Sequence, residues 1–191
     1  MSRTVLCDFD GVLLDLCGAV KKLLAKRGIE FKPENVIKYN FSGDIGCSRA
    51  DVFSTFKGFD LYKIQRPYEG AIEALCRLRN YVLVDGWTSV ASNEKKQIEY
   101  RSFLVEHYCD GGCAYVGEKP IIVDKPIDAV FEDCLENLER WSNVEGVKLF
   151  LIDQPYNQEV HNPEYSSLFP KLIRCENFAD AVDKYIKTLS V

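Results

Sequence analysis

The chain has 191 residues, of which 47 % are apolar and 28 % charged, a composition that supports a buried core and excludes global disorder. Its formal net charge of −5 argues against a protein that coats polymeric nucleic acid, and no run approaches the ~20 apolar residues of a membrane-spanning helix. Two early aspartates, Asp8 and Asp10, stand where a signal peptide needs apolar residues, so we expect a cytoplasmic protein.

The first predicted elements are a strand over residues 4–9 and an amphipathic helix over 16–27, which Gly28 ends. Residues 29–66 differ from the rest, because they are rich in glycine and aromatic residues and follow no regular period. We expect an irregular or helical insertion there.

Regular patterns resume at Pro67. They predict helices over 70–79, 94–108, 135–141 and 178–189, the last with Asn177 as its cap, and strands over 81–84, 114–116, 129–131, 147–152 and 172–174. Strands that alternate with helices indicate an α/β fold with a mostly parallel sheet covered on both faces. Ligands of such sheets bind beyond the carboxyl ends of the strands.

Acidic pairs end two of the predicted strands. Asp8 and Asp10 are two residues apart, so in an extended strand their side chains project together, and Glu132 and Asp133 end another apolar run. If the two strands are neighbours, four carboxyl groups converge, which requires a divalent cation. Oxygen ligands of this kind favour Mg²⁺ bound together with a substrate phosphate. The alternative is that these acids and Gly11 only mark turns.

The eight cysteines are expected to be reduced and mostly buried, as small apolar side chains are. Cys7, directly before Asp8, should pack under the sheet. A metal half-site of His107, Cys109 and Cys113 is the less favoured alternative, because the other histidine, His161, lies far away in sequence.

Asp8-Phe9-Asp10-Gly11-Val12 resembles the first motif of the haloacid dehalogenase-like (HAD) phosphohydrolases. Three more segments resemble the remaining motifs in the same order: Trp87-Thr88-Ser89, Gly117-Glu118-Lys119-Pro120 and Val130-Phe131-Glu132-Asp133. Residues 67–75 and 151–157 are similar to the 5'(3')-deoxyribonucleotidase branch and its phage and bacterial relatives. The resemblance covers roughly residues 3–160.

The resemblance implies a Rossmann-like core over residues 1–15 and 67–191 and a small, mainly helical cap over 16–66. It implies that Asp8 is the nucleophile that forms an aspartyl-phosphate, and that Asp10 is the general acid and base. Mg²⁺ would be held by the side chains of Asp8 and Asp133 and by the backbone carbonyl of Asp10. Glu132 would orient the ion and its waters.

Thr88, Ser89 and Lys119 would bind the phosphoryl group, with two points left open. Either Thr88 or Ser89 carries the second motif, because Asp85-Gly86 is expected to interrupt the strand before them, and Lys125 is the alternative to Lys119.

The implied substrate is a (deoxy)nucleoside monophosphate, whose base could stack on aromatic residues of the cap, with Phe41 and the stretch 49–56 as the best candidates. The alternatives are a HAD phosphatase for another small phosphoester, such as a sugar phosphate, and a non-catalytic receiver-like or scaffold domain.

Overall fold

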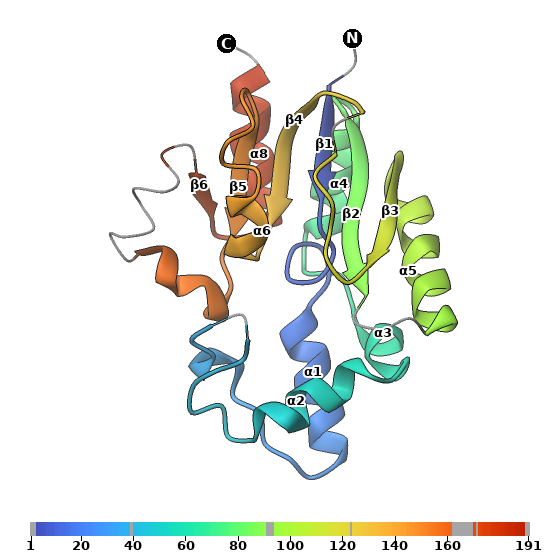
Figure 1. Cartoon of the computed structure of the whole chain (residues 1–191), viewed down its shortest axis with the longest axis vertical. Coiled ribbons are helices and arrows are strands. Elements are labelled where there is room, and N and C mark those ends of the chain that lie inside the picture. The colour runs from blue at the N-terminus through green and yellow to red at the C-terminus, as the bar shows by residue number, and fades with distance from the viewer. Residues whose placement is uncertain are drawn as a thin grey trace.

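The computed structural model describes residues 3–38, 40–90, 94–122, 124–161, 170 and 172–189. Their strands form one six-stranded sheet with the order β3-β2-β1-β4-β5-β6, and every neighbouring pair is parallel (Figure 1). The strands are β1 (Thr4–Cys7), β2 (Leu83–Val90), β3 (Gly111–Val116), β4 (Ile127–Glu132), β5 (Lys148–Ile152) and β6 (Leu172–Cys175). The predicted α/β class and parallel sheet are confirmed.

Helices cover the two faces of the sheet unequally. One face packs on α4 (Ala71–Arg79), α5 (Lys95–Tyr108) and α8 (Phe178–Leu189), and its core includes Cys7, which is fully buried. The other face packs on α6 (Leu135–Glu139), with Trp87 and Trp141 in edge-to-face contact. Both faces of β1 and β4 are therefore apolar, which is the pattern of central parallel strands.

The second strand is longer than predicted, and the expected interruption at Asp85-Gly86 is wrong. β2 runs unbroken through both residues to Val90. Gly86 fits because its missing side chain leaves room for Val105 of α5, and the backbone of Gly112 on β3 lies close against it. Asp85 is buried and paired with Lys125, so the strand tolerates its charge.

The chain leaves and re-enters the core at neighbouring positions. Asp15 N–H donates to the carbonyl of Arg66 at 2.9 Å, and Tyr68 N–H donates to the carbonyl of Leu13 at 2.9 Å. The segment between these contacts, residues 16–66, lies beyond the carboxyl ends of the strands (Figure 1). We call it the inserted segment.

The inserted segment contains α1 (Leu16–Lys26), η1 (Pro33–Asn35), α2 (Arg49–Phe56) and α3 (Asp60–Ile64). Asp15 caps α1 by accepting from Gly18 N–H at 2.7 Å, and Ser48 and Asp51 form a capping box on α2. The segment has an apolar cluster of its own, which includes Val20, Phe41 and, from outside the segment, Tyr156. Its status as a separate cap stays a prediction.

Among the helices of the described residues, none combines the length and apolar character needed to cross a membrane.

Candidate active site

Three buried carboxylates meet at the ends of β1 and β4. Asp8 follows β1, and Glu132 and Asp133 lie at the end of β4, with one ligand oxygen from each within 4.8 Å of the others. The two strands are neighbours in register, and Asp8 N–H donates to the carbonyl of Phe131 at 3.0 Å. The predicted meeting of these strand ends is therefore confirmed for three of the four acids.

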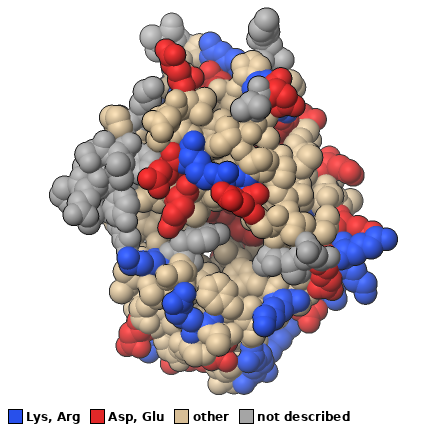
Figure 2. Space-filling view, viewed as in Figure 1, with Lys and Arg blue, Asp and Glu red and all other residues tan. Residues whose placement is uncertain are grey.

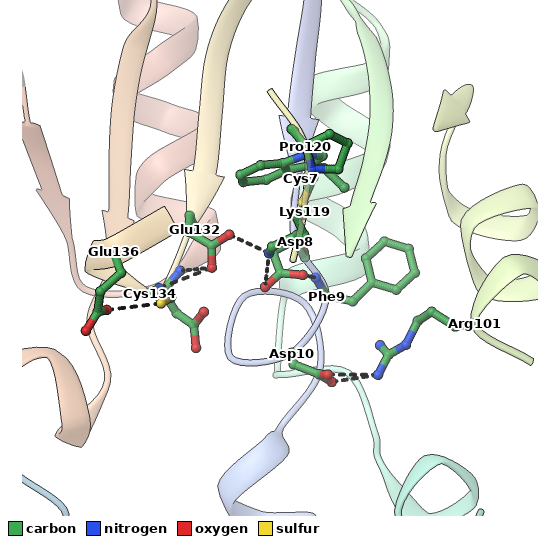
Figure 3. A network of polar contacts seen from close by, with 12 residues as sticks. Cys7, Asp8, Phe9, Asp10, Arg101, Lys119, Pro120, Glu132, Cys134 and Glu136 are labelled. Carbon is green, nitrogen blue, oxygen red and sulfur yellow. Dashed lines mark hydrogen bonds and ion pairs between the residues drawn. The ribbon is translucent and has the colours of Figure 1, made fainter. Parts of the chain in front are cut away.

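Lys119 is the cation that this acidic cluster contains. Its Nζ lies 2.9 Å from Asp8 Oδ2 and 2.6 Å from Glu132 Oε2, and 4.6 Å from the ring centre of Trp87 (Figure 3). Lys125 instead pairs with Asp85. Of the two candidate lysines, the structure brings Lys119 and not Lys125 to the nucleophile candidate.

Burial dominates the electrostatics of the cluster, and Lys119 opposes it. Burial, followed by the charge of Glu132, raises the pKa of Asp8 to about 6 against the attraction of Lys119. Burial and the two neighbouring carboxylates hold the pKa of Asp133 well above its ordinary value. Burial also disfavours the ionised form of Glu132, but Lys119 and the hydrogen bonds from Asp133 and Cys134 together outweigh burial and lower the pKa of that carboxyl. One lysine is thus shared between Asp8 and Glu132, and the pKa values of Asp8 and Asp133 stay raised.

The residues present fit a hard divalent cation. The second carboxylate oxygen of Asp133, Oδ1, is buried and has no hydrogen-bond partner within the part of the chain that the structure describes. An unsatisfied buried oxygen among other carboxylates is what an oxygen-coordinated cation such as Mg²⁺ would relieve.

Asp10 does not join this cluster, so the expectation of four converging side chains is wrong. β1 ends at Cys7, and the carbonyl of Phe9 accepts hydrogen bonds from Leu13 and Leu14 N–H at 2.9 and 2.7 Å. The chain turns there, so the alternation of an extended strand no longer relates Asp8 to Asp10.

Arg101 and Gln65 hold the Asp10 carboxylate instead. Arg101 Nη2 donates to both Asp10 oxygens at 2.9 and 2.8 Å (Figure 3). Gln65 Nε2 donates to Asp10 Oδ1 at 2.6 Å. Arg101 has 0 % exposure and lies over the ring of Tyr62 at 5.0 Å. Burial lowers the pKa of Arg101, but the charge and hydrogen bonds of Asp10, together with Tyr62 and Asp8, outweigh burial and raise this pKa.

The two phosphate-site candidates on β2 face different surroundings. Thr88 is fully buried, and its hydroxyl has no hydrogen-bond partner among the described residues. Ser89 is half-buried and lines a cavity together with Asp10. Strand alternation places Ser89 on the same face as Trp87, which contacts Lys119.

A cavity of about 300 Å³ lies where the inserted segment meets the residues that follow β1 and the end of β2. Half of its lining residues are aromatic, and the lining comes from both parts: Asp10, Leu16, Asn40, Phe41, Phe53, Phe56, Tyr62 and Ser89. Figure 2 shows a recess at this level, between the sheet above and the inserted segment below. A ligand in this cavity would touch Asp10 and the aromatic rings together.

Sequence reasoning missed Gln65, Arg101 and Tyr156, all of which touch the predicted acids. Arg101 lies on a helix whose sequence has the charged residues of an ordinary exposed helix. Nothing in the local sequence pattern indicates that the Arg101 side chain is fully buried. Tyr156 lies in the segment 151–157, which carries part of the family resemblance. That resemblance was the sequence signal that could have identified Tyr156 as a site residue.

The cysteines are unpaired, as expected, but Cys76 and Cys113 are exposed rather than buried. The alternative half-site at His107, Cys109 and Cys113 is not formed. In the described ranges, the acidic cluster is the one group of three or more such side chains placed to hold a metal.

Comparison with known proteins supports the fold. No protein-family model matches the chain, and no curated protein matches it. Solved structures do match. A haloacid dehalogenase-like family hydrolase from Streptococcus pneumoniae is 13 % identical with a TM-score of 0.54, and 98 % of each chain is covered.

Two further structures agree. One from Burkholderia xenovorans LB400, a candidate haloacid dehalogenase-like hydrolase, is 16 % identical with a TM-score of 0.58 and 98 % coverage of both chains. CbbY from Rhodobacter sphaeroides, solved with phosphate, is 14 % identical with a TM-score of 0.50, covering 94 % of this chain and 96 % of its own. The chain therefore has the fold of the haloacid dehalogenase-like hydrolases.

Proposed function

We propose that this protein is a Mg²⁺-dependent phosphomonoester hydrolase that works through an aspartyl-phosphate on Asp8 and acts on (deoxy)nucleoside monophosphates. The observation that carries the proposal is the buried cluster of Asp8, Lys119, Glu132 and Asp133 at the ends of adjacent parallel strands. Ligands bind at this edge of such sheets. Of the four segments that resemble the family's motifs, the first supplies Asp8, the third Lys119 and the fourth both Glu132 and Asp133, and Trp87 of the second lies beside Lys119.

Asp8 is the proposed nucleophile. Its carboxylate oxygen attacks phosphorus, forming an O–P bond while the bond from phosphorus to the ester oxygen breaks. Asp10, at the cavity wall, gives a proton to the leaving alkoxide. Water then attacks the aspartyl-phosphate, Asp10 takes its proton, and phosphate and free Asp8 result.

Asp8 and Asp133 would hold Mg²⁺ through their side chains, and Asp10 through its backbone carbonyl. The ion would supply positive charge to the carboxylates and to the phosphoryl oxygens. Glu132 accepts from Asp133 and Cys134 N–H at 3.1 Å each and from Lys119, so we assign it the role of fixing this turn and the lysine.

Lys119 and Ser89 are the proposed ligands of the phosphoryl oxygens. Lys119 contacts the nucleophile directly, and Ser89 lines the cavity with Asp10. A lysine and a hydroxyl are suited to the charge that develops on these oxygens in the transition state. Thr88 stays the alternative to Ser89.

The aromatic cavity favours a nucleoside as the leaving group. Phe41, Phe53, Phe56 and Tyr62 line it beside Asp10, which has to reach the ester oxygen. Aromatic side chains stack on any base, whereas a sugar phosphate needs mainly polar partners. Its volume, about 300 Å³, is at the small end of ligand pockets, in keeping with a mononucleotide and not a polymer.

A substrate panel tests the proposal. The wild-type protein and Asp8→Asn would be assayed for phosphate release from 5'- and 3'-monophosphates of ribo- and deoxyribonucleosides, from sugar phosphates and from p-nitrophenyl phosphate. We expect release that needs Mg²⁺, is abolished by EDTA and favours nucleotides. A preference for sugar phosphates would reject the substrate class. Absence of release from every compound would favour the receiver-like or scaffold alternative.

A further inference from the structure

Tyr156 joins the acidic cluster to the inserted segment. It lies in η2 (Pro155–His161), which follows β5, and it is buried. Its hydroxyl donates a hydrogen bond to Asp133 Oδ2. Its ring lies 6.2 Å from the ring of Phe41, centre to centre, and belongs to the apolar cluster of the inserted segment. One side chain therefore contacts a proposed metal ligand and the wall of the substrate cavity.

The turn that carries Tyr156 is fixed to the sheet by its neighbours. Asn157 Nδ2 donates to the backbone carbonyls of Asp133 at 2.9 Å and Ile152 at 2.7 Å, and its Oδ1 accepts from Gln154 N–H at 3.0 Å. Gln154 Nε2 donates to the carbonyl of Gly11 at 2.7 Å. These bonds tie the turn to both acidic loops, so the hydroxyl of Tyr156 is held in place.

Gly11 shows how closely this group is packed. Its φ of +74° favours glycine, and a Cβ there would collide with the carboxylate of Asp133 and the hydroxyl of Tyr156. The backbone of Gly11 and the hydroxyl of Tyr156 thus both lie close to Oδ2 of Asp133.

This packing leaves the two oxygens of Asp133 in different states. Oδ2 accepts from Tyr156, whereas Oδ1 is buried with no partner among the described residues. A carboxylate held by one oxygen presents the other in a fixed direction. Groups that hold a metal ligand in this way typically affect metal affinity by about 10–100-fold.

We propose that Tyr156 is a positioning residue that aims Asp133 Oδ1 at the divalent cation and makes cation affinity depend on the packing of the inserted segment. The inference rests on the proposed function, because it needs Asp133 to be a metal ligand. It goes beyond that function in giving the segment 154–157 a role in the metal site.

Direct binding of Mg²⁺ without substrate tests the role of the hydroxyl. Calorimetric titration of the full chain should give Tyr156→Phe an affinity about tenfold or more below that of the wild type. The phenylalanine ring keeps the contact with Phe41, so circular dichroism should match the wild type and melting in EDTA should stay cooperative.

Tyr185→Phe is the matched control. Tyr185 is also buried and also donates to an aspartate, Asp128 Oδ2 at 2.6 Å, on the same strand β4 but away from the cluster. The substitution Tyr185→Phe removes the same kind of hydrogen bond and should leave Mg²⁺ affinity within about twofold of that of the wild type. Replacing Tyr156 with 4-aminophenylalanine, which keeps a donor at the same place, should restore affinity and carries the test if Tyr156→Phe does not fold.

Each outcome decides the proposal. Equal Mg²⁺ affinity of the wild type and Tyr156→Phe overturns the proposal about Tyr156. So does a loss of affinity in Tyr185→Phe as large as that in Tyr156→Phe, or failure of the amino analogue to restore affinity. In all three cases the proposed function still stands. If the wild type binds no Mg²⁺, the proposed metal site and this inference both fail.

Discussion

The surroundings of Asp8 favour the protonated form of its carboxyl over the charged form. Its pKa is raised from 3.8 to about 6, chiefly by burial. Between these values the folded protein binds more protons than the unfolded chain, so its stability falls as pH rises through this window. Above it, the metal-free protein carries the whole cost of the buried charge, on the order of 3 kcal/mol.

Asp8→Asn should therefore raise the melting temperature of the metal-free protein at pH 7, because it removes that cost. At pH 4 the wild-type carboxyl is mostly protonated, so the two melting temperatures should nearly coincide. Thermal melts in EDTA at both pH values measure this. A lower melting temperature for Asp8→Asn at pH 7 would mean that the attraction of Lys119 exceeds the burial penalty.

The two candidate lysines should respond very differently to replacement. Lys119→Met leaves Asp8 and Glu132 buried together without a cation, a change that typically costs about 3–5 kcal/mol, and it removes the proposed phosphate ligand. We expect kcat to fall at least 100-fold. Lys125→Met, whose pair with Asp85 lies apart from the cluster, is the control and should retain most of the activity. Equal losses in the two variants would contradict the assignment.

At the scale of elements, the sequence predicts where the site lies better than how it is arranged. Apolar runs that end in acids predict β1 and β4, and their pairing brings Asp8 to Asp133. The turn after Cys7 is not visible in the sequence, because it depends on three amide groups converging on the carbonyl of Phe9. Asp10 is therefore misplaced by a strand argument.

Long-range partners explain the other misses. The length of β2 depends on Gly86 meeting Gly112 and Val105, which come from a different strand and a helix. Arg101 is 91 residues away from Asp10, and a helical pattern alone does not say that this arginine turns inward.

Arg101→Met should disturb proton transfer by Asp10 more than any other step. Without the two bonds from Arg101, the carboxyl of Asp10 loses its fixed place at the cavity wall. We expect kcat to fall at least tenfold for a nucleoside monophosphate, whose leaving alkoxide needs a proton, and less for p-nitrophenyl phosphate, whose leaving group does not.

Arg77→Met provides the control for this comparison. Arg77 pairs with Asp183 at 2.8 Å on the surface, so both rates should stay near those of the wild type. An equal loss of kcat on both substrates in Arg101→Met would show that Arg101 acts on something other than the proton of Asp10.

For the whole molecule, the resemblance places a cap between the first two motifs, but the sequence does not say which of its aromatics face the cavity. Phe31 is buried in the segment's own core, whereas Phe53 is 42 % exposed and lines the cavity. Phe41 does both, and its φ of +58° is the one positive value among described non-glycine residues. Strained backbone of this kind is often found at functional sites.

Phe53→Ala should separate base recognition from catalysis. Because Phe53 is partly exposed, its loss should spare the fold. Stacking on one base is worth about 1–3 kcal/mol, so KM for a nucleoside monophosphate should rise about tenfold with kcat little changed. Steady-state kinetics on that substrate and on ribose 5-phosphate, which has no base, measure the difference. A rise of the same size for both would reject a stacking role.

Asp8 is expected to carry the phosphoryl group during turnover. The protein would be mixed with Mg²⁺ and a nucleoside monophosphate, quenched in acid within one turnover, and digested for mass spectrometry. We predict a phosphoryl adduct on the peptide that contains Asp8. The adduct should be absent when EDTA replaces Mg²⁺, and Asp8→Asn should show neither the adduct nor phosphate release. Release of phosphate at the wild-type rate by Asp8→Asn, or an adduct on another residue, would show that Asp8 is not the nucleophile.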